Sequence, residues 1–590
     1  MPVRASVTSP ASPPAAARLA SRARVSLRAH VRARIRGRDR VVSAVAPRAA
    51  LDLDALDLGQ TLGAIKRKEA LLNLPPGKVG LFGARETFEY LADPNAFIKK
   101  RVAKYGPVFK TGFFFKPAIV FGSREAVEAF REFEASLPAD AALPETFREL
   151  HTAYGALRQS GAEHEATRAN FGRVLGRAAL ERYAPILARQ TRDFVLGEVL
   201  VGKCGNSGGF LTEQQKRTLQ REGRITVSED GVVTRIASDE ENQTSSPKLQ
   251  PGYDLRQFCL RSLFELFLGV TPPEALMNEM YAYNEGLLAL GKLSPEFEEG
   301  QKALKTLLEY VEKHYRTIRA QGKLESDERF FFLRQYSTAT DENGDLFPDD
   351  RVATTAVLMI WGAYIEAAAN MGHCLWTLMR HPEALAETKK ETRRAFTSAD
   401  VKSADPSAFS LGRCFETLTY CEAVVKETLR VVPQTAGGLR VNPTLRKFLE
   451  YDVPAGYVLT ADPRVAFLDQ ENFPEPETFA PERFLATSDE RRIAYSEANV
   501  NVNAIVVRDY GGASDPDAYF PGGVGQHKCP GISLSTLMTQ IFLVYVSSAF
   551  DGWAPDESDE GSFDPEYVQI PIVIIDDKYR LSLEKNWQYE

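Results

Sequence analysis

A glycine-rich loop that leads directly into an apolar segment constrains the fold of this chain more than any other feature. The loop, Phe520–Gly531, reads Phe-Pro-Gly-Gly-Val-Gly-Gln-His-Lys-Cys-Pro-Gly, and the apolar segment Ile532–Phe550 follows it at once. Glycine lacks a Cβ atom, so such a loop can turn tightly and approach a flat ligand closely. The apolar segment has the length and residue composition of a buried helix. The sequence therefore predicts a core helix whose N-terminus carries a ligand-binding loop.

The loop contains one cysteine, Cys529, just before the predicted helix. At this position the helix dipole and the loop N–H groups favour the thiolate over the thiol. A thiolate held in this way is a suitable axial ligand for haem iron, and it donates electron density that favours cleavage of an O–O bond. A single cysteine near a glycine-rich loop can also be an inert thiol, so the interpretation depends on other parts of the chain.

Two distant segments contribute charged residues that suit such a site. Glu427 and Arg430 are three positions apart in an expected helix, Leu418–Val432, and therefore share one helix face. Arg483 lies in the proline-rich segment Pro481-Glu-Arg-Phe484. An arginine in such a loop could complete a cluster of Glu427, Arg430 and Arg483.

A third segment carries His164 and Arg168, four positions apart on one face of an expected helix. Both side chains could bind a carboxylate such as a propionate of haem. The order and spacing of these segments, with Leu74–Gly80 and Lys104–Phe109, resemble the cytochrome P450 family over residues 72–590. The pattern is most similar to the branch with retinoid, sterol and bile-acid hydroxylases and prostacyclin synthase.

The resemblance implies a mainly α fold: one large helical domain with small β-sheets, and haem between a long central helix and the helix after the cysteine loop. It implies haem b as the cofactor, with Cys529 as the axial ligand of its iron. It also implies a structural role for the cluster of Glu427, Arg430 and Arg483. The other residues expected at the cofactor are His164, Arg168, Arg440, His527, Gly523, Gly525 and Gly531.

Two positions of the loop depart from the family pattern. Seven residues before the cysteine the family usually has Phe, and this chain has Gly522. Two residues before it the family usually has Arg, and this chain has His527, which can still contact a propionate. The missing Phe ring normally shields the sulfur, so its loss concerns the redox properties of the site rather than iron binding.

The expected central helix, Asp349–Arg380, carries the candidate catalytic residue Glu366. In monooxygenases of the family an acid followed by Thr on this helix relays protons to bound oxygen. Here the two positions fall on Ile365 and Glu366 or, with a shift of one residue, on Glu366 and Ala367, so an acid is present without a Thr. A charge in an apolar helix must be paired or have a shifted pKa. Glu366 is therefore either part of a core ion pair or a proton donor.

The resemblance leaves two reactions open. The first is a haem-thiolate monooxygenase that takes O₂ and electrons from a ferredoxin-type or NADPH-dependent donor and inserts one oxygen atom into a lipophilic isoprenoid, sterol-like or fatty-acid-like molecule. The second is a hydroperoxide or endoperoxide isomerase, lyase or dehydratase of the same fold, which needs no reductase. We favour the monooxygenase, with a role in lipid metabolism, because the loop and Gly362–Ala363 are ordinary for it. A non-catalytic haem sensor does not account for the pocket elements.

Composition narrows the remaining classes. With 590 residues, 44% of them hydrophobic, the chain can bury a large core. Its six cysteines show no close pairing and no Cys-x-x-Cys motif, which disfavours a disulfide framework, zinc sites and iron–sulfur clusters.

Residues 1–50 differ from the rest of the chain, with eleven Arg, six Ser, no Lys and one acid, Asp39. This composition is typical of an organellar transit peptide, and we expect a plastid protein, with the mitochondrion as the alternative. A basic arm that binds nucleic acid or membrane is the other interpretation. The remaining 540 residues have 61 basic and 78 acidic side chains, so we expect no nucleic-acid binding.

Two further segments interrupt or precede the domain. Residues 51–71 are expected to form a polar helical connector. Residues 202–250 are expected to be a surface insertion, with Arg224–Val227 and Val232–Ile236 forming a hairpin around an Asp-Gly turn. A docking element for a partner is the alternative role of this insertion.

Membrane and partner contacts can also be anticipated. No N-terminal apolar run reaches the roughly 18 residues of a membrane anchor, so we expect no transmembrane anchor, although peripheral membrane association stays open. The longest apolar stretch, Thr354–Met379, is expected to be a core helix. A basic patch that could receive an acidic electron carrier, or be an ordinary solvated helix face, consists of Lys389, Lys390, Arg393 and Arg394.

Overall fold

The computed structural model describes residues 71–80, 83–205, 220, 225–227, 233–235, 246–289, 291–485, 518–556, 572–577, 579–586 and 588. The expected transit peptide and most of the connector lie outside the described residues.

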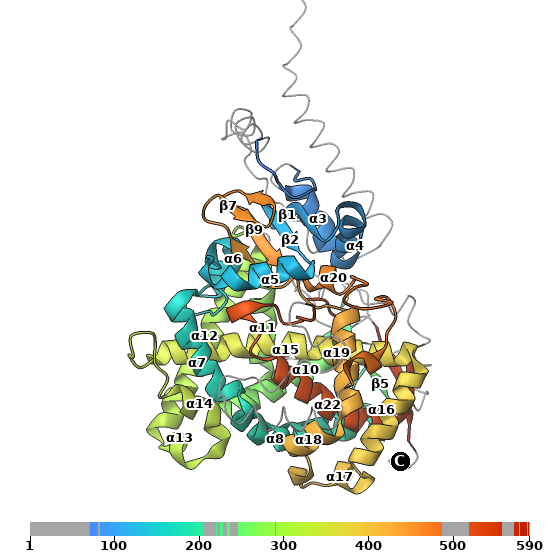
Figure 1. Cartoon of the computed structure of the whole chain (residues 1–590). Helices are drawn as coiled ribbons and strands as arrows, with labels where there is room; N and C mark the ends of the chain where they lie inside the picture. The colour runs from blue at the N-terminus through green and yellow to red at the C-terminus, as the bar shows by residue number, and fades with distance from the viewer. Residues whose placement is uncertain are drawn as a thin grey trace, which may run out of the picture.

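Helices dominate and the sheets are small, which confirms the predicted fold class (Figure 1). The helices are α3 (Ala84–Ala92), α4 (Pro94–Tyr105), α5 (Arg124–Phe133), α6 (Glu145–Leu150), α7 (Gly161–Leu175), α8 (Arg177–Phe194), α10 (Pro251–Leu268), α11 (Glu274–Leu287), α12 (Pro295–Ala320), α13 (Lys323–Ser326), α14 (Phe331–Tyr336), α15 (Asp349–Arg380), α16 (Pro382–Ala395), α17 (Ser398–Lys402), α18 (Leu411–Thr417), α19 (Thr419–Val431), α20 (Pro463–Ala466) and α22 (Ile532–Ala549).

The strands form a four-stranded sheet and smaller ones. In the larger sheet the order is β1-β2-β9-β6, with β2 and β9 parallel and the other neighbours antiparallel. A three-stranded sheet has the order β10-β11-β5, and two hairpins pair β3 with β4 and β7 with β8. The strands are β1 (Val108–Phe113), β2 (Lys116–Phe121), β3 (Ile225–Val227), β4 (Val233–Arg235), β5 (Lys248–Leu249), β6 (Arg440–Val441), β7 (Arg446–Phe448), β8 (Tyr451–Val453), β9 (Val458–Ala461), β10 (Phe550–Pro555) and β11 (Leu581–Lys585).

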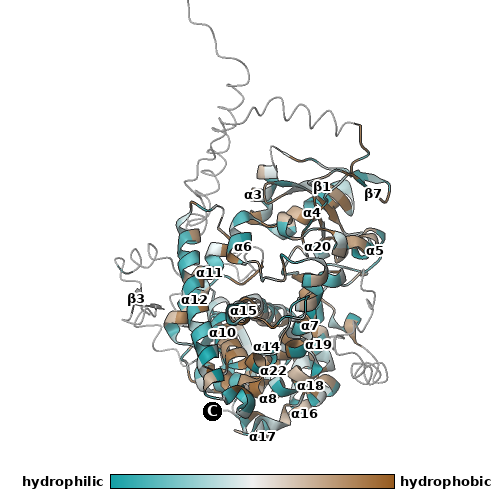
Figure 2. Cartoon of the chain, turned by 90° about the vertical axis from the view of Figure 1, so that its left-hand side faces the viewer, coloured by the Kyte–Doolittle hydropathy of each residue, from teal (hydrophilic) through white to brown (hydrophobic). Residues whose placement is uncertain are grey.

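The long helix α15 is the centre of the helical part of the molecule. It begins after Pro348 with two aspartates in its first turn, where acids complement the helix dipole, and it ends before Pro382, which cannot continue a helix. Figure 2 looks nearly along α15 and shows it between α10, α14 and α19. Its residues are buried on nearly every side, which is the pattern of a core helix.

The helix α22 after the cysteine loop is also buried on nearly every side and packs against α15, α16 and α8. Among the described residues, α15 and the segment Gly525–Ala549 are long and apolar enough to span a bilayer. However, 78% and 72% of their most apolar windows are buried inside the fold, as in the core helices of a globular domain.

The expected insertion leaves and re-enters the fold at one place. Its predicted hairpin is confirmed, because Ile225–Val227 pairs antiparallel with Val233–Arg235. At the base, the buried Asp254 carboxylate accepts hydrogen bonds from the backbone N–H groups of Gly205 (3.0 Å) and Gln250 (2.7 Å). The two ends of the segment are therefore held by one side chain of α10.

Candidate active site

The cysteine loop turns through two glycines and holds the cysteine with backbone hydrogen bonds. Gly523 and Gly525 have φ angles of 83° and 72°, in the region that favours glycine. The Cys529 N–H donates to the Gly522 carbonyl at 2.8 Å. Burial raises the pKa of the Cys529 thiol to about 12 and the Glu366 carboxylate adds to this, whereas the N–H groups of Gly531 and Ile532 and the Arg168 guanidinium oppose it. The N–H groups at the helix start thus act toward the thiolate, as the sequence predicted, but in this structure burial outweighs them and the pKa of Cys529 is raised.

One side of the core helix α15 is not covered by other residues around Gly362. Gly362 is exposed, and Ala363 and Glu366 are half-buried, although their neighbours Trp361 and Ile365 are buried. A Cβ added at Gly362 would meet no atom within 4 Å. Glu366 lies three positions after Ala363 and four after Gly362, so its side chain is on the same side of the helix as both. A side of a core helix is therefore left open, and the charge of the Glu366 carboxylate on that side contributes to the raised pKa of Cys529.

Glu366 is not part of a core ion pair. Among the described residues no side chain bonds its carboxylate, and burial alone raises its pKa to about 7. Its backbone carbonyl accepts a hydrogen bond from Gln434 Nε2 at 3.3 Å, which links α15 to the segment before β6. Within the described residues, the open side of α15 thus carries a carboxyl group without a side-chain partner, whose pKa burial raises to about 7.

The expected cluster of Glu427, Arg430 and Arg483 is assembled. Arg430 Nε and Nη2 donate to the Glu427 carboxylate at 2.6 and 2.8 Å, and Arg483 Nε lies 3.5 Å from it. The Ala480 N–H adds a further bond to Glu427 at 2.8 Å. Arg430 also donates to three carbonyl groups of the following loop, those of Phe467, Pro476 and Thr478. The cluster therefore ties α19 to the loop that precedes the cysteine region.

The expected propionate contacts are arranged differently from the sequence prediction. Arg440 and His527 both bind Glu134, a carboxylate that the sequence analysis did not single out. Glu134 follows α5 and is one of several acids in that region, and nothing in the local pattern distinguishes it. Its two partners are 306 and 393 positions away, so only the tertiary fold reveals the contact.

His164 serves as a stacking partner rather than as a cation. Its ring lies on the ring of His527, with centroids 3.7 Å apart and planes 19° apart. Burial lowers the pKa of His164 to about 3, and the nearby His527 and Arg168 lower it further, so the imidazole is neutral. A neutral imidazole still has one N–H donor, so the predicted contact of His164 with a propionate stays a prediction.

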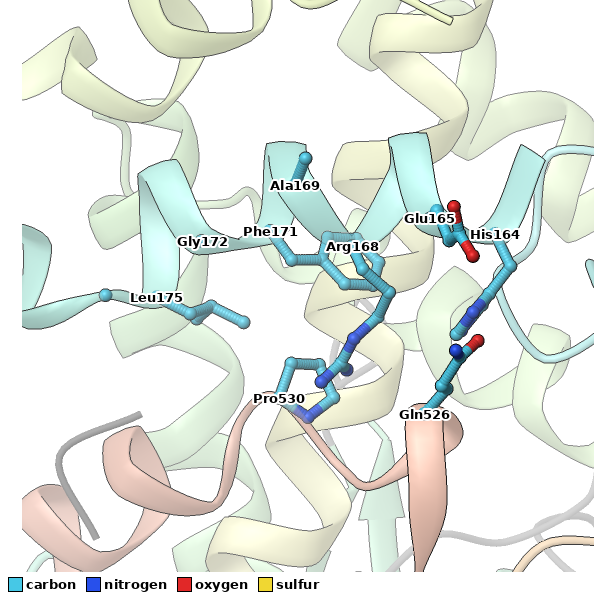
Figure 3. A pocket seen from close by; sticks show the side chains of 10 residues that line it. His164, Glu165, Arg168, Ala169, Phe171, Gly172, Leu175, Gln526 and Pro530 are labelled. Carbon is cyan, nitrogen blue, oxygen red and sulfur yellow. The ribbon is translucent and has the colours of Figure 1, made fainter. Parts of the chain in front are cut away.

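Arg168 is the residue of this group that has no recorded partner among the described residues. It is half-buried and lines a hollow of 290 Å³ between α7 and the cysteine loop. Figure 3 shows its guanidinium group pointing from α7 to Pro530, with His164 and Gln526 beside it. Burial lowers the pKa of Arg168, and the nearby Cys529 and Glu134 counteract this effect.

These observations fit a flat, carboxylate-bearing cofactor with an iron centre. On the open side of α15, Gly362 has no side chain and is exposed. Gly438, before β6, is also an exposed glycine. Cys529 provides a soft ligand supported by N–H groups, and Arg168 provides a free cation beside it. The residues present therefore suit haem held by Cys529.

The basic patch on α16 is engaged within the fold. Lys389 donates to the Asp551 carbonyl at 2.6 Å, and Arg393 binds the Asp551 carboxylate at 2.9 Å, so both residues tie α16 to the region after α22. Lys390 pairs with Glu387 at 3.0 Å. Only Lys390 makes the within-helix pair of an ordinary solvated helix face, and Lys389 and Arg393 have a structural role that neither interpretation included.

Comparisons with known proteins agree with this geometry. A family model described as Cytochrome P450 matches residues 276–581. The taxane 10-beta-hydroxylase of Taxus cuspidata is 24% identical over 494 residues, which cover 83% of this chain and 86% of that protein. The cholesterol 16,22-dihydroxylase CYP90G4 of Trigonella foenum-graecum is 21% identical over 521 residues, 85% of this chain and 91% of that protein. The structure titled "Retinoic acid bound cyanobacterial CYP120A1" is similar in fold, with a TM-score of 0.64 at 20% identity, covering 87% of this chain and 100% of its own.

Proposed function

The chain belongs to the cytochrome P450 family, and from this premise we infer that Cys529 is the thiolate ligand of its haem iron. Membership makes it a haem-dependent monooxygenase of lipophilic molecules that uses O₂ and a redox partner. Haem, when bound, supplies the activation of oxygen. The chain's own residues hold the sulfur, shape the open face of α15 and deliver protons to it.

The observation that carries the proposal is the pair formed by Cys529 and Glu366. The two groups interact through space, and Glu366 lies on the open face of α15 without a partner among the described residues. A carboxyl group with a pKa of about 7 both holds and releases a proton near neutral pH, which suits a general acid. Glu366 thus performs proton delivery without the hydroxyl that the family usually places beside the acid, because the next residue is Ala367.

The relatives narrow the substrate class. One is named for hydroxylation of a taxane and another for hydroxylation of cholesterol. We propose an isoprenoid or sterol-like molecule as the substrate. We further propose that the electron donor is a ferredoxin-type or NADPH-dependent protein. We also propose that residues 1–50, which are rich in Arg and poor in acids, direct import into a plastid. An intact N-terminus in protein from its natural source would contradict the import proposal.

The ligand is tested with the carbon monoxide complex of the reduced protein. We expect the strongly red-shifted Soret band of thiolate ligation, its loss in Cys529→Ser, and its retention in the control Cys204→Ser, which changes another buried cysteine. Retention of the band in Cys529→Ser would show that another group is the ligand.

The reaction is tested with two kinds of substrate. We expect O₂- and reductant-dependent hydroxylation of an isoprenoid or sterol, with part of the reduced oxygen lost as peroxide and better coupling in Ala367→Thr. Fast conversion of fatty-acid hydroperoxides without any reductant would favour the peroxide-rearranging enzymes of this fold instead.

A further inference from the structure

Glu134 is a charged residue of the site for which the resemblance provides no role. It lies in the short 3-10 helix Glu134–Ser136 after α5, and 1% of its surface is exposed. Its Oε2 atom accepts hydrogen bonds from Arg440 Nε (3.1 Å) and Nη2 (3.0 Å) and from His527 Nδ1 (2.9 Å). Its Oε1 atom accepts one from the backbone N–H of His527 (3.2 Å). A buried carboxylate with four donors has a defined position, so it can hold in place the groups that donate to it.

The cysteine loop is shaped around this carboxylate. Gly525 begins the short 3-10 helix Gly525–His527, and a Cβ added to it would overlap Oε1 and Cγ of Glu134. Its φ angle of 72° is one that a residue with a side chain rarely adopts. At the other end of this turn, the Lys528 N–H donates to the Gly525 carbonyl at 3.2 Å, and Cys529 follows at once. The turn that packs against Glu134 therefore leads directly into the cysteine.

His527 links this contact to the helical part of the molecule. Its Nε2 atom lies 3.1 Å from the Gln159 carbonyl oxygen, before α7, and its ring stacks on that of His164 in α7. A carbonyl and an ionised carboxylate can only accept, so both ring nitrogens of His527 act as donors, as the N–H groups of an arginine would. His527 occupies the position where the family pattern has Arg. Its two hydrogen bonds hold the cysteine loop between the end of α5 and the start of α7.

Glu134 also brings a negative charge to this region at neutral pH. Burial raises the pKa of its carboxyl group, but the hydrogen bonds of His527 and the charge of Arg440 outweigh this and hold the pKa at about 2. Both Glu134 and Cys529 act on the pKa of Arg168, against the effect of burial. The carboxylate and the cysteine therefore lie on either side of the same cation.

We propose that Glu134 is a positioning residue for the Cys529 thiolate, which fixes the turn Gly525–His527 of the cysteine loop and adds a negative charge beside the iron site. The inference rests on the proposed haem-thiolate function and deepens it. Groups that surround a metal ligand in this way affect both the strength of the ligand and the reduction potential of the metal. A nearby negative charge stabilises ferric over ferrous iron, so Glu134 lowers the reduction potential.

The reduction potential of the haem-loaded full chain is the first test. Glu134→Gln keeps the shape of the side chain and removes its charge. The ferric–ferrous equilibrium should therefore shift about tenfold toward the ferrous form, a rise of about 59 mV for one electron. An unchanged potential in this variant would overturn the proposal.

Two control variants accompany this measurement. Glu128→Gln removes an acid from an exposed position of α5, where solvent screens the charge. Leu307→Ala leaves a cavity in the core at α12 and lowers the stability of the fold without removing a charge. Each should change the ferric–ferrous equilibrium less than about twofold. A shift in Leu307→Ala as large as that in Glu134→Gln would show that the potential follows overall stability, and would overturn the role of the charge.

The strongly red-shifted Soret band of the reduced carbon monoxide complex tests the position of the loop. Glu134→Ala removes the contacts with His527 and with the turn, so this band should convert to a less shifted form about 10-fold faster than in the wild type. Glu134→Gln keeps an acceptor for the His527 N–H and should convert more slowly than Glu134→Ala. Equal rates in Glu134→Ala and Leu307→Ala would mean that Glu134 only stabilises the fold, and would overturn the proposal.

The same measurement separates this inference from the function on which it rests. A wild-type chain without the red-shifted band would refute the haem-thiolate function itself, and this inference with it. A wild type with the band, together with Glu134 variants that match it in potential and in rate of conversion, would refute the role of Glu134 alone.

Discussion

Two buried carboxylates, Glu427 and Glu134, are each held by arginine, but the chain assembles their clusters in different ways. Glu427 binds Arg430 three positions later on the same helix and reaches Arg483 in a nearby loop. Glu134 binds Arg440 and His527, which are 306 and 393 positions away. The Glu427 cluster is a local unit of helix and loop, whereas the Glu134 cluster exists only after distant segments have met.

This difference indicates which part of the structure each cluster stabilises. Helix geometry alone places Glu427 opposite Arg430, and Arg430 then binds three loop carbonyls, so this cluster stabilises the domain near the cysteine region. Glu134 instead joins α5, the β6 segment and the cysteine loop at the edge of the haem site. We expect substitutions in the first cluster to destabilise the fold most, and substitutions in the second to affect both the stability of the fold and the site.

The largest expected effect is that of Arg430→Leu. It leaves Glu427, which is fully buried, without its main partner, and breaking a buried ion pair costs about 3–5 kcal/mol. The free energy of unfolding from denaturant titration measures the loss. Arg394→Leu, an exposed position on α16, is the control and should change stability by less than about 0.5 kcal/mol. Similar losses in both variants would show that the cluster is not a structural centre.

Glu134→Ala should give the next largest effect, and one that depends on pH. The His527 and Arg440 contacts hold the pKa of Glu134 at about 2, below its ordinary value of 4.5, despite the opposing effect of burial. Its contribution is therefore present above pH 4.5 and is lost as the pH falls toward 2, and amounts to about 3 kcal/mol at neutral pH.

Unfolding of the wild type and Glu134→Ala should accordingly differ at pH 7 and converge near pH 2–3. The control is Glu128→Ala at an exposed position of α5, which should change stability by less than about 0.5 kcal/mol. A stability difference that stays constant with pH would mean that the carboxylate charge is not what matters at this position.

Glu366→Gln contrasts both clusters with a carboxyl group that has no partner. Its folded pKa of about 7 exceeds the ordinary 4.5, so the wild type loses stability as the pH rises through this range. We expect the variant to be more stable than the wild type by about 3 kcal/mol at pH 8 and equally stable at pH 4. Turnover should fall about 10- to 100-fold. Thermal unfolding at both pH values and product formation test these outcomes; unchanged turnover would leave Glu366 without a catalytic role.

The smallest expected effect is that of Arg483→Ala. Its side chain is 17% exposed and lies 3.5 Å from Glu427, on the solvent side of the cluster. A partly solvated ion pair contributes roughly 0.5–1 kcal/mol. A loss of stability as large as that of Arg430→Leu would show that Arg430 and Arg483 stabilise Glu427 equally, contrary to their difference in burial.

Features with a local pattern were predictable from the sequence. The bounds of α15 follow from the aspartates and prolines at its ends, and the pair of Glu427 and Arg430 follows from helix spacing. The place of Cys529 before a helix N-terminus follows from the glycine-rich loop and the apolar run.

Features that depend on tertiary contacts were not predictable. Glu134 looks like any acid at the end of an amphipathic helix until Arg440 and His527 meet it, and no local pattern indicates that the ring of His164 stacks on that of His527. The charge of Lys389 and Arg393 was visible, but their use in binding Asp551 was not, because it depends on how α16 lies against the end of α22.

Asp254 holds both ends of the inserted segment, which has a consequence for how the sequence of that segment can vary. Because the two ends of the segment converge on one carboxylate of α10, we expect that sequence can be exchanged between them without altering the path of the flanking helices. The same arrangement makes residues 206–247 a suitable graft point for a reporter or a tethered electron carrier, since a replacement has to span only the short gap between Gly205 and Lys248.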